Sequence, residues 1–282
     1  MGPVAALLPG DRLHLQHGPI DLIIGADGDW HAAFAAARAR FASVLDELVS
    51  EMDLLRRPVA EVPRGAIARC MSDAVRPHAD GIVTPMAAVA GSVAQTVLAA
   101  MVAATPLTRA YVNNGGDIAL HLTGAETFRL AVAAPDGMDL GRIAITAQHP
   151  VRGIATSGQG GRSLSLGIAD AVTVLARSAS QADVAATLIG NAVDLPDHDA
   201  ITRTKAREVQ PDSDLRDHLV VTRVGTLRAQ EVDAALDRGL SVAQNMAARG
   251  LIQGAALFLR GAARMTGLPE SEILQGKTLT HA

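Results

Sequence analysis

The chain alternates between short runs with a two-residue hydrophobic period and longer runs with helical spacing. Near the start, Arg12–Gln16 and Ile20–Gly25 alternate on either side of His17-Gly18-Pro19, which predicts a β-hairpin. From Asp27 to Leu55, hydrophobic residues recur every three or four positions. This spacing predicts one long amphipathic helix with Asp27 or Asp29 as its N-cap.

The middle of the chain changes to short apolar or alternating runs that are separated by Gly, Asn or Pro. This pattern is typical of an antiparallel meander rather than of alternating strands and helices. The runs are Arg109–Asn113, Asp117–Leu122, Phe128–Ala133 and Arg142–Ala147. After them we expect a buried strand at Asp170–Ala176, a helix at Ser180–Val193 capped by Ser180, an exposed connection at Pro196–Asp217, a strand at Leu219–Val224 and one or two helices between Gln230 and Arg264.

Two further helices are predicted before the meander, a short one at Arg64–Val75 and an apolar one that begins at Met86. The run from Met86 to Ala104 has no charged residue and approaches the roughly 20 residues that span a bilayer. Most of its apolar residues are alanines, however, and alanine contributes little to membrane insertion. We therefore expect a buried core helix. Since no repeat or long linker interrupts the pattern, residues 1–282 are predicted to form a single α+β domain with a largely antiparallel sheet packed against helices.

Composition excludes several classes of protein. Aromatic residues make up 2% of the chain, namely four Phe, one Trp and one Tyr, and the net charge is −4. A nucleic-acid binder would need a basic surface and usually aromatic platforms for bases, so we expect no nucleic-acid partner. The hydrophobic fraction of 49% argues against disorder, and Cys70 is the only cysteine, which excludes a disulfide scaffold. The N-terminal residues resemble neither a signal peptide nor a lipidation motif, so we expect a cytoplasmic protein with no membrane partner.

Two glycine-rich segments are candidates for ligand binding. The first, Asn113-Asn114-Gly115-Gly116-Asp117, is a hairpin turn in its simplest interpretation, because Asn-Gly supplies the positive φ of a tight turn. Alternatively, its glycines allow a ligand to approach the backbone, with Asp117 beside it. The second contains Thr156-Ser157-Gly158, followed by Arg162. Backbone N–H groups and a guanidinium can bind phosphates, although a surface loop explains the same residues.

Two acidic residues are candidates for chemistry. Asp183 and Thr187 are four apart on a predicted helix, which brings a carboxylate and a hydroxyl to one face. Two hard oxygen ligands suit Mg²⁺, while the alternative is a first-turn Asp favoured by the helix dipole and a Thr bonded to its own backbone. Asp170 stands at the entry to a predicted strand, where it is either a general base or the cap of a turn.

The order of these segments resembles the ApbE superfamily, whose typical members are Mg²⁺-dependent FAD:protein FMN transferases. The segment NNGGDIAL is similar to the family's GGD turn, GIATSG to its TSG loop, and ADVAAT to its AD-x-x-AT helix. SLGIADAVTVLA falls where the family has an H-x-x-D-P strand entry, and PMAAVAGSVAQTVLAAM where it has a G-x-x-x-K-G helix. The whole chain, including PDSDL, resembles more closely an ApbE-related family of cytoplasmic proteins that brings no established activity.

The resemblance implies a flavin site. Asp183 and Thr187 would hold Mg²⁺ on the pyrophosphate of FAD, together with the backbone carbonyl of Ala87. The TSG loop and Arg162 would contact the phosphates, and the NNGGD turn would approach the nucleotide. The partner would be an acceptor flavoprotein whose Ser or Thr receives FMN. A bound flavin ring would have few stacking partners, with Tyr111 and Trp30 the sole candidates besides Phe.

The chain departs from the family at two groups that carry charge or protons. Ala90 stands where the family has lysine, Gly167 where it has histidine, and Ala171 replaces the proline. Whether the chain is an enzyme therefore stays open between two hypotheses. It either cleaves FAD and transfers FMN with Mg²⁺, or it binds a flavin or nucleotide without catalysis, as an accessory to a redox enzyme. The pattern does not indicate an oligomeric state.

Overall fold

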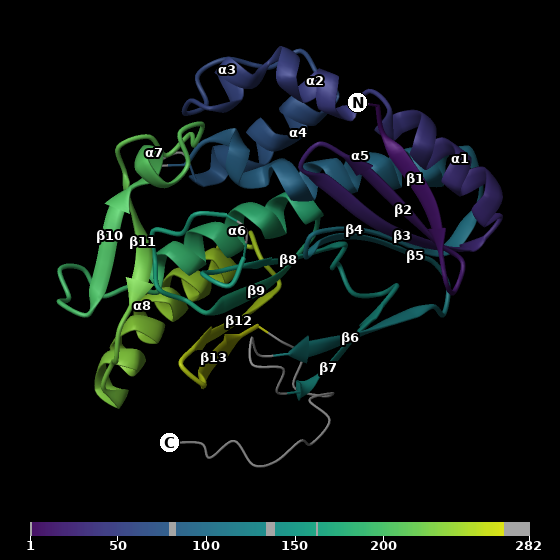
Figure 1. Cartoon of the computed structure of the whole chain (residues 1–282). Coiled ribbons are helices and arrows are strands. Elements are labelled where there is room, and N and C mark those ends of the chain that lie inside the picture. Colours follow the sequence, from purple (N-terminus) through teal and green to yellow (C-terminus); the bar gives the residue numbers. More distant parts are fainter. Residues whose placement is uncertain (1, 79–82, 134–138, 162, 268–282) are drawn as a thin grey trace.

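The computed structural model describes residues 2–78, 83–133, 139–161 and 163–267, without the side chains of residues 130–142. A nine-stranded sheet runs through it in the order β1-β2-β3-β4-β5-β8-β9-β12-β13, and each strand is antiparallel to its neighbours (Figure 1). Its strands are β1 (Val4–Leu8), β2 (Arg12–His17), β3 (Ile20–Gly28), β4 (Leu107–Asn114), β5 (Asp117–Leu122), β8 (Gly153–Ser157), β9 (Ala171–Ala176), β12 (Gly254–Leu259) and β13 (Ala262–Thr266). The predicted combination of helices with an antiparallel sheet is confirmed.

The main helices cover one face of this sheet. Helix α1 (Trp30–Phe41) and helix α5 (Val89–Ala104) pack over β3 to β5, α6 (Ala179–Ala192) packs over β8 and β9, and α8 (Ala229–Ala248) over β12 and β13. The opposite face is partly covered by the hairpin of β6 (Thr127–Ala133) and β7 (Asp139–Thr146), which Figure 1 shows below the sheet. Buried apolar residues on both faces hold these layers together.

The opening hairpin is confirmed, because β2 and β3 pair around Gly18 and Pro19. The pattern missed β1, which adds an edge strand to this hairpin. Four of the five residues of β1 are exposed, including Val4 and Leu7, so the strand shows no alternation between a buried and an open face.

The prediction of one long helix from Asp27 to Leu55 is wrong. The segment forms the end of β3 and then three helices, α1, α2 (Val44–Ser50) and α3 (Met52–Leu55). Asp29 is the N-cap, as one of the two candidates, and its Oδ1 accepts a hydrogen bond of 3.1 Å from the Ala32 N–H.

Two glutamates of this segment bind the start of the next helix. Glu51 accepts hydrogen bonds from the backbone N–H groups of Arg64 and Gly65 at 2.7 and 2.6 Å, and Glu47 accepts one from Ile67 at 2.9 Å. These groups lie at the start of α4 (Ala66–Val75), the predicted short helix, where N–H groups have no partner within the helix. Glu47 and Glu51 are four residues apart, a spacing that brings both side chains to one face, and this face meets the start of α4.

The meander is confirmed in its strands and corrected in its arrangement. The runs β4 and β5 pair as predicted, but β6 and β7 leave the sheet and pair with each other. The segment Gly153–Ser157, predicted as a loop, is instead strand β8 between β5 and β9. Its glycine reflects crowding, since a Cβ on Gly153 would lie 2.1 Å from the backbone of Ser178.

The last third departs most from the prediction. The cap of α6 is Ser178 rather than Ser180, and its hydroxyl accepts a hydrogen bond from the Gln181 N–H at 3.3 Å. The connection at residues 196–217 contains β10 (Ile201–Lys205), which pairs with the predicted strand β11 (Leu219–Val224), and the short helix α7 (Ala206–Val209). One helix, α8, lies where one or two were expected, and strands β12 and β13 fill the rest of that region. The apolar run Gly254–Leu259 is a fully buried strand, which periodicity cannot distinguish from a buried helix.

The apolar run before the meander is a core helix, as predicted. A 3₁₀ turn at Pro85–Ala88 leads into α5, which packs on β4 and β5 and against α1 and α6. By length and apolar composition Pro85–Ala104 could span a membrane, but its valines and Leu98 belong to the core cluster beneath α1. At Gly91, α5 approaches α6 so closely that a Cβ would lie 2.3 Å from the carbonyl oxygen of Ala179.

We predict that Gly91→Ala lowers the free energy of unfolding by about 2 kcal/mol, because the added methyl group forces α5 and α6 apart. A glycine-to-alanine change inside a helix otherwise stabilises it by about 0.5–1 kcal/mol. Urea denaturation measures the difference. Gly190→Ala is the matched control, since Gly190 is a buried residue of α6 whose added Cβ would lie 3.9 Å from its nearest neighbours. A Gly91→Ala protein at least as stable as the parent would contradict the close contact.

Candidate functional site

A cavity of about 520 Å³ opens where the starts of α5 and β5 meet α6 and the segment that precedes β11. The size lies within the range of small-molecule sites. Its lining combines carboxylates, guanidinium groups and hydroxyls with a few apolar side chains. The lining residues used below are Arg56, Arg57, Thr84, Ala87, Ala90, Asp117, Asp183, Thr187, Asp212, Asp214, Arg216 and His218.

Asp183 is the central charged group of this cavity. It lies in the second turn of α6, and its Oδ2 accepts a hydrogen bond of 2.9 Å from the Gly91 N–H at the start of α5. Burial raises the pKa of Asp183 to about 7, although the backbone N–H groups of Gly91 and Ala90 act in the opposite direction. The carboxylate is therefore held in place by a helix N-terminus without full compensation of its charge.

Thr187 and Ala87 line the same cavity as Asp183. The structure thus brings together all three residues that the resemblance named as metal ligands. Among the described residues, no group of three or more His, Cys, Asp or Glu side chains could hold a metal ion. A cation here would rest on one carboxylate and neutral oxygens. This donor set fits Mg²⁺, which usually binds one or two carboxylates and keeps several waters, and it does not suit Zn²⁺. Metal binding by these residues stays a prediction.

The NNGGD segment is the turn between β4 and β5, so the hairpin interpretation is confirmed. Gly115 and Gly116 have φ of 65° and 114°, and the Gly116 N–H donates to Asn113 Oδ1 at 2.9 Å. The turn also approaches the cavity. Asn114 is buried and donates through Nδ2 to the carbonyl of Ala90 at 3.2 Å, and Asp117 lines the cavity wall.

The other predicted contacts lie elsewhere. Thr156, Ser157 and Gly158 form the end of β8 and the turn after it, and none of them is among the described residues that line the cavity. The Thr156 hydroxyl instead lies 3.0 Å from the Thr173 hydroxyl on β9. Arg162 lies outside the described residues. Phosphate binding by this segment stays a prediction.

Asp170 does not line the cavity either, and its carboxylate has a structural partner. Oδ2 accepts a hydrogen bond of 2.5 Å from the Arg260 N–H in the turn between β12 and β13, where Arg260 has a φ of 50°. Of the two interpretations of Asp170, this geometry is the turn cap and gives no support to a general base in the Asp183 cavity.

The chain has Ala90 and Gly167 where the family resemblance would place a lysine and a histidine, and the two positions differ in the space around them. Ala90 lines the cavity, so a longer side chain there would face open space. Gly167 is buried, and a Cβ would lie 2.2 Å from the carbonyl oxygen of Gly190 and 2.8 Å from those of Asn191 and Val193. The structure therefore has no room for a histidine at residue 167.

Several cavity residues were missed by the sequence pattern. Arg56 and Arg57 follow α3, and Arg216 lies in the connection before β11; none of the three guanidinium groups forms an ion pair with a described carboxylate. A smaller cavity of about 230 Å³ is lined by the same three arginines. From the same connection, Asp214 accepts a hydrogen bond of 2.5 Å from the Thr84 hydroxyl. In the sequence, this segment stood out only through PDSDL (residues 211–215), which resembles the ApbE-related family but had no predicted role.

A protein-family model described as "AbpE bacteria" matches residues 5–265. The chain belongs to this family. It is an ApbE-like protein, as the segments around Asp183 and the NNGGD turn predicted. A UPF0280 protein of Methanopyrus kandleri is 36% identical over 212 residues, which cover 72% of this chain and 83% of that protein. A UPF0280 protein of Archaeoglobus fulgidus is 40% identical over 119 residues, which cover 39% of this chain and 45% of that protein.

Solved structures similar to this ApbE-like chain include two transferases. The flavinyl transferase ApbE of Pseudomonas stutzeri is 11% identical, with a TM-score of 0.46 and coverage of 94% of this chain and 93% of that one. A mutant of the flavin transferase ApbE of Vibrio cholerae is 13% identical, with a TM-score of 0.47 and coverage of 94% and 97%.

We predict that Asp183→Asn stabilises the metal-free protein, and more so at pH 8 than at pH 5. The raised pKa means that the folded state favours the protonated carboxyl, a contribution that is present below the unfolded value of 3.8 and lost as the pH rises through about 7. The neutral amide avoids this loss, which is at most about 4 kcal/mol at pH 8. Thermal unfolding with a chelator present, at both pH values, measures the effect.

Asp212→Asn is the control for this prediction, because Asp212 lines the same cavity but its side chain is exposed. Its stability should follow that of the parent at both pH values. An Asp183→Asn gain that does not grow between pH 5 and pH 8 would contradict the uncompensated charge.

Proposed function

We propose that the Asp183 cavity binds FAD together with Mg²⁺ and that the chain transfers FMN from it to a serine or threonine hydroxyl of an acceptor protein. The observation that carries the proposal is the Asp183 carboxylate, fixed on one side by the Gly91 N–H and sharing its cavity with Thr187 and Ala87. This is the oxygen set that the ApbE-like resemblance assigns to the metal. The flavin is supported by membership of the family and by the turn at Asn114, which packs on the same end of α5.

The chain's own residues would share the binding of the ligand. The phosphate oxygens would be neutralised by Arg56, Arg57 and Arg216. The sequence had predicted this role for Arg162 and the metal. In a transfer, a bond forms between the acceptor oxygen and the phosphorus of FMN, the bond to the AMP phosphate breaks, and the hydroxyl proton passes to solvent. Mg²⁺, when bound, would stabilise the negative charge of that phosphoryl group.

A second function has its own support in the structure. Ala90 has no amine, and Gly167 has no space for an imidazole, so the two groups expected to neutralise charge or move a proton are missing. A protein that holds FAD without cleaving it, as an accessory to a redox enzyme, fits the same cavity. The two functions differ in one measurable product, which is AMP.

The first test concerns the ligand. With Mg²⁺ present, FAD should bind to the parent protein, and Asp183→Ala should weaken binding at least tenfold because the metal loses its only charged ligand. Removing Mg²⁺ should weaken binding by the parent to a similar degree. Isothermal titration calorimetry measures both. Asp73→Ala is the control, since Asp73 forms an exposed pair with Arg76 on α4 and should leave FAD affinity unchanged. If Asp183→Ala binds FAD as tightly as the parent, the site is wrong.

The second test concerns the reaction. AMP release from FAD, which is common to transfer and to hydrolysis, is followed by chromatography with the parent and with Ala90→Lys. We predict that Ala90→Lys releases AMP at least tenfold faster, because an ammonium group enters the cavity that holds the phosphates. Tight FAD binding with no AMP from either protein would favour the accessory function over the transferase.

A further inference from the structure

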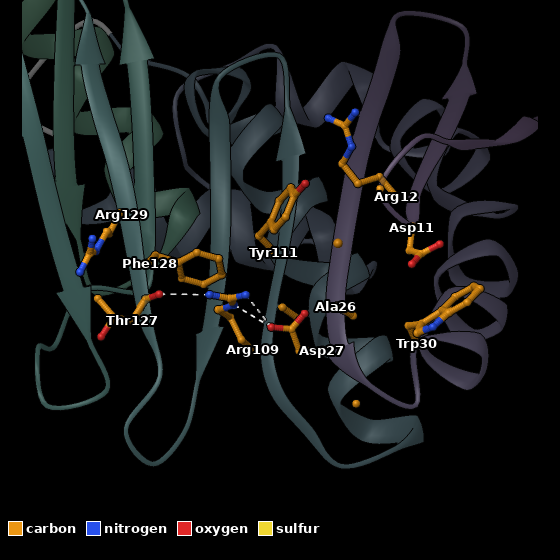
Figure 2. Close-up of a pocket in the computed structure, with 14 residues that line it drawn as sticks. Asp11, Arg12, Ala26, Asp27, Trp30, Arg109, Tyr111, Thr127, Phe128 and Arg129 are labelled. Carbon is orange, nitrogen blue, oxygen red and sulfur yellow. Dashed lines mark hydrogen bonds and ion pairs between the residues drawn. The ribbon is translucent and has the colours of Figure 1, made fainter. Parts of the chain in front are cut away.

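A second and larger cavity lies on the face of the sheet that the helices leave open. It has a volume of about 780 Å³ and is bordered by the β1–β2 turn, β3, β4, the start of α1 and β6 (Figure 2). Tyr111 points to this face, because its neighbours Ala110 and Val112 on β4 are buried on the helix side. The Asp183 cavity lies on the helix side, at the other end of β4. From Arg109 to Asn114 the strand spans about 17 Å.

Half of the chain's aromatic residues line this cavity. The chain has six, and Trp30, Tyr111 and Phe128 are among the lining residues. The Tyr111 ring lies against the backbone of β3, where a Cβ on Gly25 would come within 2.5 Å of it. Phe128 meets Tyr111 edge to face, with ring centroids 6.2 Å apart. Because these two rings are perpendicular, a flat ligand ring can stack on only one of them and meets the other at its edge.

Three arginines stand around these rings. Arg109 is fixed, since its guanidinium contacts Asp27 at 2.7 Å and its carbon lies 5.6 Å from the centre of the Phe128 ring. The Arg12 side chain donates through Nε to the Pro9 carbonyl, and the Arg129 guanidinium forms no hydrogen bond or ion pair with another described residue, although its backbone belongs to the β6–β7 ladder. Figure 2 shows Arg129 and Arg12 on opposite sides of Tyr111 and Phe128.

The charges in this cavity favour an anion. Its lining holds three arginines against Asp11 and Asp27, in a chain whose net charge is −4. Asp27 is engaged by Arg109, so Arg12 and Arg129 face a single remaining carboxylate, that of Asp11. Exposed guanidinium groups beside aromatic faces bind carboxylate or phosphate groups through paired N–H donors.

We propose that this cavity is a second ligand site, which binds a planar aromatic ring carrying a carboxylate or phosphate. The ring stacks on one of the two aromatic side chains, Tyr111 or Phe128, with the other at its edge, and the anionic group is held by the arginine on that side, Arg12 or Arg129. The site goes beyond the proposed flavin chemistry, because it shares no lining residue with the Asp183 cavity. Tyr111 and Trp30, which the sequence predicted as stacking partners for a flavin, line this cavity and not the Asp183 cavity.

The test uses matched probes and an internal reporter. Nicotinate and AMP carry a ring with a carboxylate or a phosphate, nicotinamide and adenosine carry the ring alone, and ribose 5-phosphate carries the anion alone. Equilibrium dialysis in EDTA measures binding, and Trp30, the chain's only tryptophan, reports occupancy of this cavity through its emission. We expect nicotinate or AMP to bind at least tenfold more tightly than its neutral counterpart and to change Trp30 emission, while ribose 5-phosphate does not bind.

Variants locate the binding. Either Arg12→Ala or Arg129→Ala should weaken it at least fivefold, and the variant that does so identifies the arginine that holds the anion. Both side chains are exposed, so the fold should be retained. Binding that is unchanged in both variants would overturn the inference. Arg223→Ala, an exposed arginine on β11, should change nothing. Asp183→Ala should also leave this binding unchanged, which separates the site from the flavin proposal. Three further results would overturn the inference. Neither nicotinate nor AMP binds at 10 mM, about the weakest affinity of interest; the neutral probes bind as tightly as the anions; or binding is lost only in Asp183→Ala.

Discussion

The close approach of α5 and α6 at Gly91 is the constraint on which the core and the candidate site both depend. At this point the helices are too near for a side chain, and the Gly91 N–H donates to the Asp183 carboxylate across the gap. The same helix end carries Ala90, whose carbonyl accepts from Asn114 at the β4–β5 turn. One contact between backbones thus aligns a helix N-terminus, a carboxylate and a glycine turn, which come from three distant parts of the sequence.

Asp183 shows how fold and function oppose each other in this protein. A carboxylate that is buried beside a helix N-terminus would normally be stabilised by the N–H groups, yet burial outweighs them and raises the pKa to about 7. Replacing the Asp183 carboxylate by a neutral group would remove this cost and raise the stability of the folded state. A cation bound in the cavity would offset the same cost. Ligand binding and folding stability are therefore linked at this cavity.

Local motifs were readable from the sequence, and the assembly was not. The NNGGD turn, the Asp29 cap and the Asp183–Thr187 pair each depend on residues within five positions, and the first two are found in the structure as expected. Arg56, Arg216 and Asp214 reach the cavity only through tertiary packing, so no local spacing marks them. The same holds for the second cavity, where Trp30, Tyr111 and Phe128 are spread over about a hundred residues. The long helix was predicted wrongly because the hydrophobic spacing continues from Phe41 to Val44, where the helix itself is interrupted.

The crowding at Gly167 also constrains how this chain can change in evolution. Three carbonyl oxygens at the end of α6 and just after it surround the place where any side chain would begin, and the adjoining Ile168 N–H donates to the Val193 carbonyl at 2.8 Å. A histidine at residue 167 would require the end of α6 to move, so this single substitution is expected to destabilise the fold. Ala90 and the arginines line the open cavity, so its chemistry can be altered at these positions without such a movement.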